Sequence, residues 1–273
     1  MTESTHQTGY GKGLAIATLV TIFATIVITQ ILNIIPPPGG ELVAKLANGE
    51  LSGVLILPAN YAFAIWGFVY IGIIAYGFYQ LQPNQRQDSR FRQIDILLIV
   101  ACLCQIAWMV FFPLRLYWVA VVAMLGILLP LIGIYLKLDI GKTPANRKER
   151  WRVRIPFSTY LAWISVASIV NIASALFASG WDGAFLNGQN WTVVMLIVGA
   201  VIAAIAAVQR GDTAFVLTFV WAYVAIAIRH NNLPAIWITA LVASGVLLAL
   251  LALGRKKQQP IRESQQGRSA TRV

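Results

Sequence analysis

Long apolar runs, separated by short polar connections, make up most of the chain. A helix that crosses a membrane needs about 20 mostly apolar residues. The runs that approach or reach this length are 14–35, 61–81, 94–112, 117–137, 155–178, 191–208, 213–229 and 234–253. They are continuously apolar and do not alternate as barrel strands do, so they predict helices. The pattern therefore predicts an all-α, polytopic membrane helix bundle with about eight transmembrane helices.

Two of the runs allow a second interpretation. The first run, 14–35, is longer than the roughly 7–15 apolar residues of a signal peptide, so we expect a retained helix. The run 213–229 is short and ends at Arg229 and His230. A re-entrant or amphipathic segment is the alternative to a full span there.

The composition supports lipid as the solvent of these runs. Hydrophobic residues make up 58% of the 273 positions and charged residues only 11%, against about 25% in soluble domains. The mean hydropathy is +0.72. We therefore expect an integral multi-pass membrane protein with membrane lipid as its surroundings.

The net charge of +11 predicts an orientation. Lys and Arg favour cytoplasmic loops. With both termini in the cytoplasm, all but Lys45, Arg115 and Arg229 of the 21 basic residues fall on that side. Because these charges flank helices, they favour contact with anionic lipid heads over nucleic-acid binding. We expect no nucleic-acid partner.

The ionisable residues exclude several classes of membrane protein. The aspartates at 95, 139, 182 and 212 lie at run ends or in loops, and no Glu lies in a run. This argues against proton transport through a buried carboxylate and against an aspartyl protease. His6 and His230 lie outside the bundle interior, so paired-histidine haem ligation is not expected. The sequence predicts no catalytic residue, no cofactor-binding residue and no metal site.

Cys102 and Cys104 lie two positions apart in the third run. On a helix this spacing points the two side chains to different faces. They cannot form a standard disulfide, and two thiols without partner ligands make a poor metal site. Small buried hydrophobic residues are the expected interpretation.

Three runs carry aromatic residues with one or two hydrogen-bonding groups at helical spacing. These candidate ligand-binding residues are Phe63, Trp66 and Tyr70; Gln105 and Trp108; and Tyr160, Trp163 and Asn171. An amide that faces lipid is costly, so Gln105 and Asn171 are expected to face the bundle interior. The stripes predict a pocket that opens toward the outer leaflet and reaches mid-membrane, with the loop 36–60 as its lid and Gln30 and Asn33 beside it. Ordinary packing is the alternative.

Tyr160, Trp163 and Asn171 also carry a family resemblance. Their Tyr-x-x-Trp pattern with Asn eight residues later resembles the fifth helix of the TspO/MBR family, the tryptophan-rich sensory proteins related to the translocator protein. Gln105-Ile106-Ala107-Trp108 is similar to the family's third-helix Asn-x-x-Trp, with Gln in place of Asn. Trp66 and Tyr70 match its second-helix Trp-to-Tyr spacing. The chain departs from the family in its loop 36–57, which lacks Trp, and in three helices beyond the usual five.

The resemblance implies a five-helix core at 14–178 with a pocket for tetrapyrroles such as protoporphyrin and haem, or for sterol-like lipids. By this resemblance Trp66, Trp108, Tyr160, Trp163 and Asn171 would line it, with Gln105 in the Asn position. We expect a cytoplasmic tail at 1–13, a three-helix C-terminal extension at 179–253 and a basic, disordered cytoplasmic tail at 254–273. The resemblance also implies a bacterial cell membrane and a homodimer.

The leading functional prediction is a protein that senses or transports a hydrophobic planar ligand. A tetrapyrrole would be its ligand; no cofactor is expected. The alternative is a small-molecule permease that uses all eight helices. An enzyme is the weakest prediction, because no acid–base pair or nucleophile lies within a run. The family precedent for it is light-dependent porphyrin degradation.

Overall fold

The computed structural model describes residues 3–181 and 186–270. Its longer helices are α1 (Glu3–Ile34), α3 (Ile65–Gln80), α5 (Ser89–Phe111), α6 (Tyr117–Lys137), α8 (Ile155–Ala178), α9 (Gly188–Ile205), α10 (Thr213–Arg229) and α11 (Pro234–Ala270). Short elements connect them: α2 (Val43–Asn48), η1 (Asn60–Ala64), α4 (Pro83–Arg86), α7 (Arg147–Glu149), η2 (Arg150–Arg154) and η3 (Ala206–Arg210). The prediction of an all-α polytopic membrane bundle is confirmed.

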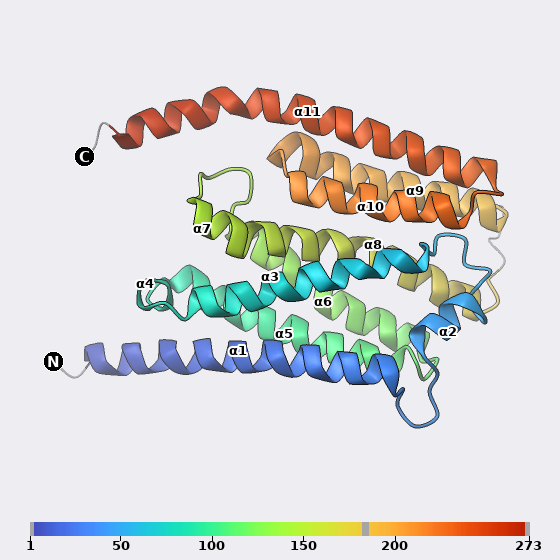
Figure 1. The fold of residues 1–273 in the computed structure, drawn as a ribbon, viewed down its shortest axis with the longest axis horizontal. Helices are drawn as coiled ribbons and strands as arrows, with labels where there is room; N and C mark the ends of the chain where they lie inside the picture. Colours follow the sequence, from blue (N-terminus) through green and yellow to red (C-terminus); the bar gives the residue numbers. More distant parts are fainter. Residues whose placement is uncertain (1–2, 182–185, 271–273) are drawn as a thin grey trace.

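Seven helices in the described part of the chain are long and apolar enough to cross a membrane. The eighth predicted run, 213–229, forms α10, which has 17 residues. At 1.5 Å per residue it is about 26 Å long, slightly less than a hydrocarbon core of about 30 Å. The start of α1 and the end of α11 lie at one end of the molecule (Figure 1). The long helices therefore bring the chain back to the end where it started.

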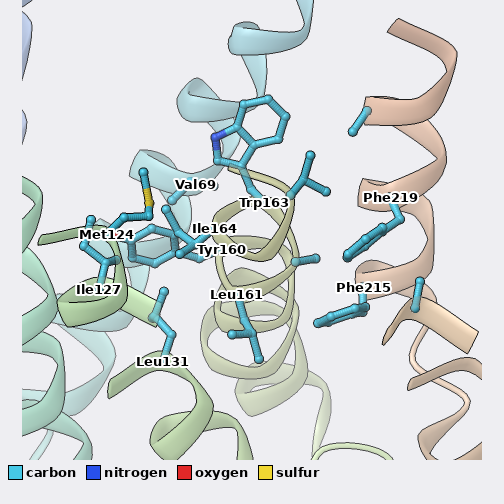
Figure 2. Packing of buried hydrophobic residues seen from close by; sticks show 14 of the residues in the cluster. Val69, Met124, Ile127, Leu131, Tyr160, Leu161, Trp163, Ile164, Phe215 and Phe219 are labelled. Carbon is cyan, nitrogen blue, oxygen red and sulfur yellow. The ribbon is translucent and has the colours of Figure 1, made fainter. Parts of the chain in front are cut away.

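The helices pack as a continuous series across the molecule (Figure 1). Helix α1 contacts α3 and α5, α5 contacts α6, and α6 contacts α8. Helix α8 also contacts α3 and α10, and α10 contacts α9 and α11. Thus α8 lies at the junction between the first five long helices and the last three. Figure 2 shows this junction. Tyr160 and Ile164 of α8 lie beside side chains of α6, and Phe215 and Phe219 of α10 lie toward α8 from the other side.

A close approach of two helices at Gly72 brings α3 against α8. A Cβ atom at this position would lie 2.6 Å from Cβ of Pro156, well inside van der Waals contact. Glycine thus lets the α3 backbone approach the start of α8, where Pro156 follows the π-helical turn η2. This contact sets the spacing of the two helices that carry most of the candidate aromatic residues.

The expectation that every aspartate lies at a run end or in a loop is wrong for Asp95. The helix starts earlier than the apolar run, because Asp88 caps it by accepting a hydrogen bond from the backbone N–H of Arg90 at 2.8 Å. Asp95 therefore lies about 9 Å inside α5, buried, and accepts a 2.6 Å hydrogen bond from Tyr76. Asp182 lies outside the described residues.

The predicted tails overlap the two terminal helices. The apolar spans run from Gly11 to Ile34 and from Pro234 to Lys256, close to the predicted 14–35 and 234–253. Helix α1 begins before the first span and α11 continues past the last. Residues 1–2 and 271–273 of the predicted tails lie outside the described residues. The division into tails, core and extension stays a prediction.

Candidate functional site

A cavity of about 680 Å³ lies between α1, α3, α5, α6 and α8, at the end of the bundle that carries the loop 36–60. Pockets for small organic ligands span roughly 300–1,000 Å³. Seven of the eight candidate residues line this cavity: Phe63, Trp66, Tyr70, Gln105, Trp108, Trp163 and Asn171. Residues from three separate runs of the sequence thus meet around one space.

Aromatic rings form the frame of the cavity. Trp66 and Tyr70 stack with ring centroids 5.4 Å apart, one turn apart on α3. Phe63 meets Trp163 edge to face at 5.7 Å, which joins η1 to α8. Trp66 meets Tyr160 in the same way at 5.9 Å. Such contacts hold the rings in fixed orientations, and a flat apolar molecule can pack against their exposed faces.

A chain of hydrogen bonds closes one side of the cavity. The Tyr160 hydroxyl donates to Oε1 of Gln105, and Nε2 of Gln105 donates to the Tyr70 hydroxyl at 3.4 Å. The Tyr70 hydroxyl lies 3.2 Å from Oγ1 of Thr29, which donates to the carbonyl of Thr25. Because the Thr29 proton is used there, Tyr70 is the donor to Thr29. This chain ties α8, α5, α3 and α1 together.

Asn171 differs from these partnered groups. Its Oδ1 accepts a 2.8 Å hydrogen bond from Nε1 of Trp108. An indole nitrogen only donates, so the amide oxygen must face Trp108 and Nδ2 must face away. Asn171 is 2% exposed and lines the cavity, and its Nδ2 has no hydrogen-bond partner among the described residues. A buried donor left unpaired costs about 1–3 kcal/mol, and an acceptor on a ligand would remove that cost.

No described residue that lines the cavity is charged. The amides of Gln30, Asn33 and Asn60 are the polar groups at the loop end. Nearby charges on the loop are paired with each other or with the α5–α6 turn: Lys45 with Glu41 at 2.7 Å, and Arg115 with Glu50 at 2.8 Å. The hydrogen bond from Lys45 lowers the pKa of Glu41, so this pair stays ionised at neutral pH. The cavity surface itself is neutral.

Comparison with known protein families identifies the family of this chain. The sequence profile described as TSPO-like protein matches residues 15–253. The chain belongs to the TSPO-like family. No curated protein and no solved structure matches it significantly. The match runs through α9, α10 and α11 as well as the first five long helices, further than the 14–178 over which the motifs carry the resemblance.

In this TSPO-like protein, all but one of the candidate residues face the cavity. Tyr160 is the one candidate residue behind the cavity wall; it is 1% exposed and supports Gln105 from the far side. The amide of Asn60 and the α6 residues Met124 and Ile127 also line the cavity and were not predicted. The apolar run 117–137 contains no amide to indicate which of its faces lies inward.

Proposed function

We propose that this TSPO-like membrane protein binds a hydrophobic planar ligand, a tetrapyrrole or a sterol-like lipid, in the cavity, in order to sense or transport it. The observation that carries the proposal is an aromatic cavity whose lining includes Asn171, a residue with a buried and unpaired Nδ2. Apolar walls with a few placed polar groups are typical of small-molecule sites. The rings supply contact area and Asn171 supplies one directional anchor.

The neutral wall favours an uncharged form of the ligand. A free porphyrin dicarboxylate that enters the cavity must leave its carboxylates at the loop end or bury them without a cation, which is costly. A porphyrin ester or a sterol-like lipid avoids this cost. We therefore expect protoporphyrin IX dimethyl ester to bind more tightly than protoporphyrin IX itself.

The experiment is a titration of the purified protein with both porphyrins, followed by tryptophan fluorescence. Saturable quenching that weakens in Trp163→Phe supports the proposal. Trp151→Phe is the matched control, because Trp151 is exposed and lies outside the cavity wall. Equal quenching in the two variants, or quenching that does not saturate in either variant, contradicts the proposal.

Transport through a permease formed by all eight helices is the second candidate. The observation that favours it is that α10 contacts the segment at the loop end of the cavity, through a hydrogen bond from Nε1 of Trp221 to the carbonyl of Ala62. Ligand-dependent flux in proteoliposomes would support a permease, and binding without flux would support a sensor.

We also propose that both termini face the cytoplasm of a bacterial cell. The excess of basic residues in the loops at the end that carries the termini supports this orientation. Fusion of a topology reporter to the C-terminus tests it. A reporter active only on the far side of the membrane would contradict the proposal.

A further inference from the structure

Helix α10 holds part of the first long loop through Arg229. The guanidinium group of Arg229 donates to the carbonyl of Ala47 at 2.9 Å, to Oδ1 of Asn48 at 3.1 Å and to the carbonyl of Pro58 at 3.3 Å. Two of these acceptors are backbone carbonyls at the end of α2 and in irregular backbone, where no helix supplies a donor. Arg229 forms no ion pair within the described part of the chain. The charged guanidinium group therefore donates its hydrogen bonds to oxygen atoms of the loop.

Three further bonds join the same two segments. The ring Nε2 of His230 lies 3.1 Å from the carbonyl of Leu57. The backbone N–H of Ala59 donates to the carbonyl of Ala225 at 3.1 Å. Nε1 of Trp221 donates to Ala62 at 3.0 Å, and its ring meets Tyr61 edge to face. We call Trp221, Ala225, Arg229 and His230, with their partners in segment 47–62, the clasp.

The clasped segment is also a wall of the cavity. Ala47, Leu57, Pro58 and Asn60 line the cavity. The first three accept hydrogen bonds of the clasp, and Asn60 follows Ala59, which donates one. The segment therefore has one side toward the cavity and another side fixed to α10. Movement of the segment away from α3 and α8 would open the cavity at its loop end.

Other bonds also attach the loop: the backbone N–H of Glu41 donates to the carbonyl of Pro113 at 3.1 Å, and the Tyr117 hydroxyl donates to Oε1 of Glu50 at 3.2 Å. Glu50 pairs with Arg115 at 2.8 Å, but both side chains are 44% exposed. Exposed ion pairs of this kind contribute little to stability. In the clasp, His230 is buried and Arg229 is half-buried, and hydrogen bonds from a charged donor are the stronger kind. The clasp thus supplies more hydrogen bonds to segment 47–62 than the α5–α6 turn does.

We propose that the C-terminal helices act on the cavity through the clasp: α10 holds segment 47–62 over the cavity, and release of Arg229 sets the rate of ligand entry and exit. The holding of the segment rests on the contacts alone, whereas the control of ligand exchange rests on the proposed function. Arg229 is a positioning residue, because it does not line the cavity. The C-terminal helices, through α10, then have a role at the cavity.

The test compares Arg229→Gln with Arg210→Gln in the full chain, reconstituted in lipid nanodiscs. Arg210 is the matched control, because its guanidinium also bonds a backbone carbonyl, that of Ile140 at 3.2 Å, away from the loop. Asn48→Ala removes one of the three acceptors of Arg229, together with the bonds from Asn48 to Ala44 and Asn60. Two readouts are measured: hydrogen–deuterium exchange of segment 43–62, and the rate of transfer of protoporphyrin IX dimethyl ester from the protein to excess empty vesicles.

We expect the Ala59 amide to exchange roughly tenfold faster or more in Arg229→Gln, since a charge-assisted hydrogen bond is worth about a tenfold change in an equilibrium. Asn48→Ala should give an intermediate increase and Arg210→Gln none. Transfer of the porphyrin ester to the vesicles should accelerate in the same order, because the residues that line the cavity are unchanged.

Two results overturn the proposal. Unchanged exchange of segment 43–62 in both Arg229→Gln and Asn48→Ala means that α10 does not hold it. Faster exchange with porphyrin rates equal to those of Arg210→Gln means that the clasp only stabilises the loop. If the unaltered protein binds no porphyrin, the proposed function fails, and the exchange data still decide whether α10 holds the segment.

Discussion

At the scale of single residues, the pair of Asn171 and Trp108 distinguishes this cavity from ordinary packing. The indole fixes the oxygen of the amide, so the free donor is Nδ2 and its direction is set by a neighbour 63 positions away in the sequence. Helical spacing predicts that Asn171 faces inward, because an amide in lipid is costly. It does not predict which amide atom is free, since that depends on a contact between α5 and α8.

Replacement of Asn171 by Leu should weaken binding of a ligand that carries ester carbonyl acceptors more than binding of one that lacks them. We expect Asn171→Leu to bind protoporphyrin IX dimethyl ester about 3–10-fold more weakly, the value of one hydrogen bond of about 0.5–1.5 kcal/mol. Etioporphyrin, which has alkyl groups in place of the esters, should lose less than about twofold. Fluorescence titration measures both. Equal losses for the two porphyrins would mean that the variant only disturbs the cavity wall.

At the scale of elements, the approach of α3 to α8 at Gly72 sets the width of the cavity. Gly72→Ala should lower the free energy of unfolding by about 1–3 kcal/mol, because the added methyl group overlaps Pro156 and the helices must separate. Gly67→Ala on the same helix is the control, since a Cβ there meets nothing within 4 Å. The midpoint of thermal unfolding in detergent measures the effect. A variant at Gly72 as stable as the one at Gly67 would contradict the close contact.

The clasp should also respond to acid. Burial lowers the pKa of His230 below 6.5; the bond to Leu57 raises it and nearby Arg229 lowers it further, with a net decrease. A histidine whose pKa is lower in the folded state contributes stability that is present above about pH 6.5 and is lost as the pH falls toward its folded pKa. Hydrogen exchange of segment 43–62, corrected for the intrinsic rate, should therefore increase between pH 7 and pH 5. The same increase in His230→Asn would assign the effect to another group.

At the scale of the whole molecule, α10 connects the three C-terminal helices to the core at both of its ends. One end is the clasp. At the other, Oδ2 of Asp212 accepts hydrogen bonds from Tyr135 at 2.9 Å and from Ser158 at 2.5 Å. Oδ1 of the same carboxylate caps α10 by accepting from the backbone N–H groups of Ala214 and Phe215. One buried side chain thus joins α6, α8 and α10.

Asp212→Asn should destabilise the protein without opening the cavity. The amide keeps an oxygen for the helix cap but places an NH2 group where two hydroxyls now donate, so we expect a loss of about 1–2 kcal/mol. Asp139→Asn is the control, because Asp139 is exposed and its φ of 45° is one that Asn tolerates. Thermal unfolding measures the loss, and porphyrin transfer rates should stay unchanged. Faster transfer in Asp212→Asn would place control of the cavity at this end of α10 as well.

Most of the fold could be predicted from the sequence, and less of the site. Hydrophobicity is local, so the bounds of α6 and α8 agree with the predicted 117–137 and 155–178. Helix α5 begins five residues before its apolar run because a polar cap, Asp88, sets its start. The clasp could not be predicted, since Arg229 and its acceptors lie more than 170 positions apart in the chain and only the packing of α10 on η1 and α8 brings them together.

The most direct test of the central claim is photo-crosslinking with a diazirine derivative of protoporphyrin IX dimethyl ester in nanodiscs, followed by peptide mapping. The account predicts labels on cavity residues of α3, α5 and α8, such as Trp66, Met109 and Val170, which unlabelled ester removes by competition. Labels confined to lipid-facing residues such as Ile71 and Phe78, or to the apolar groove between α9 and α11, would contradict it.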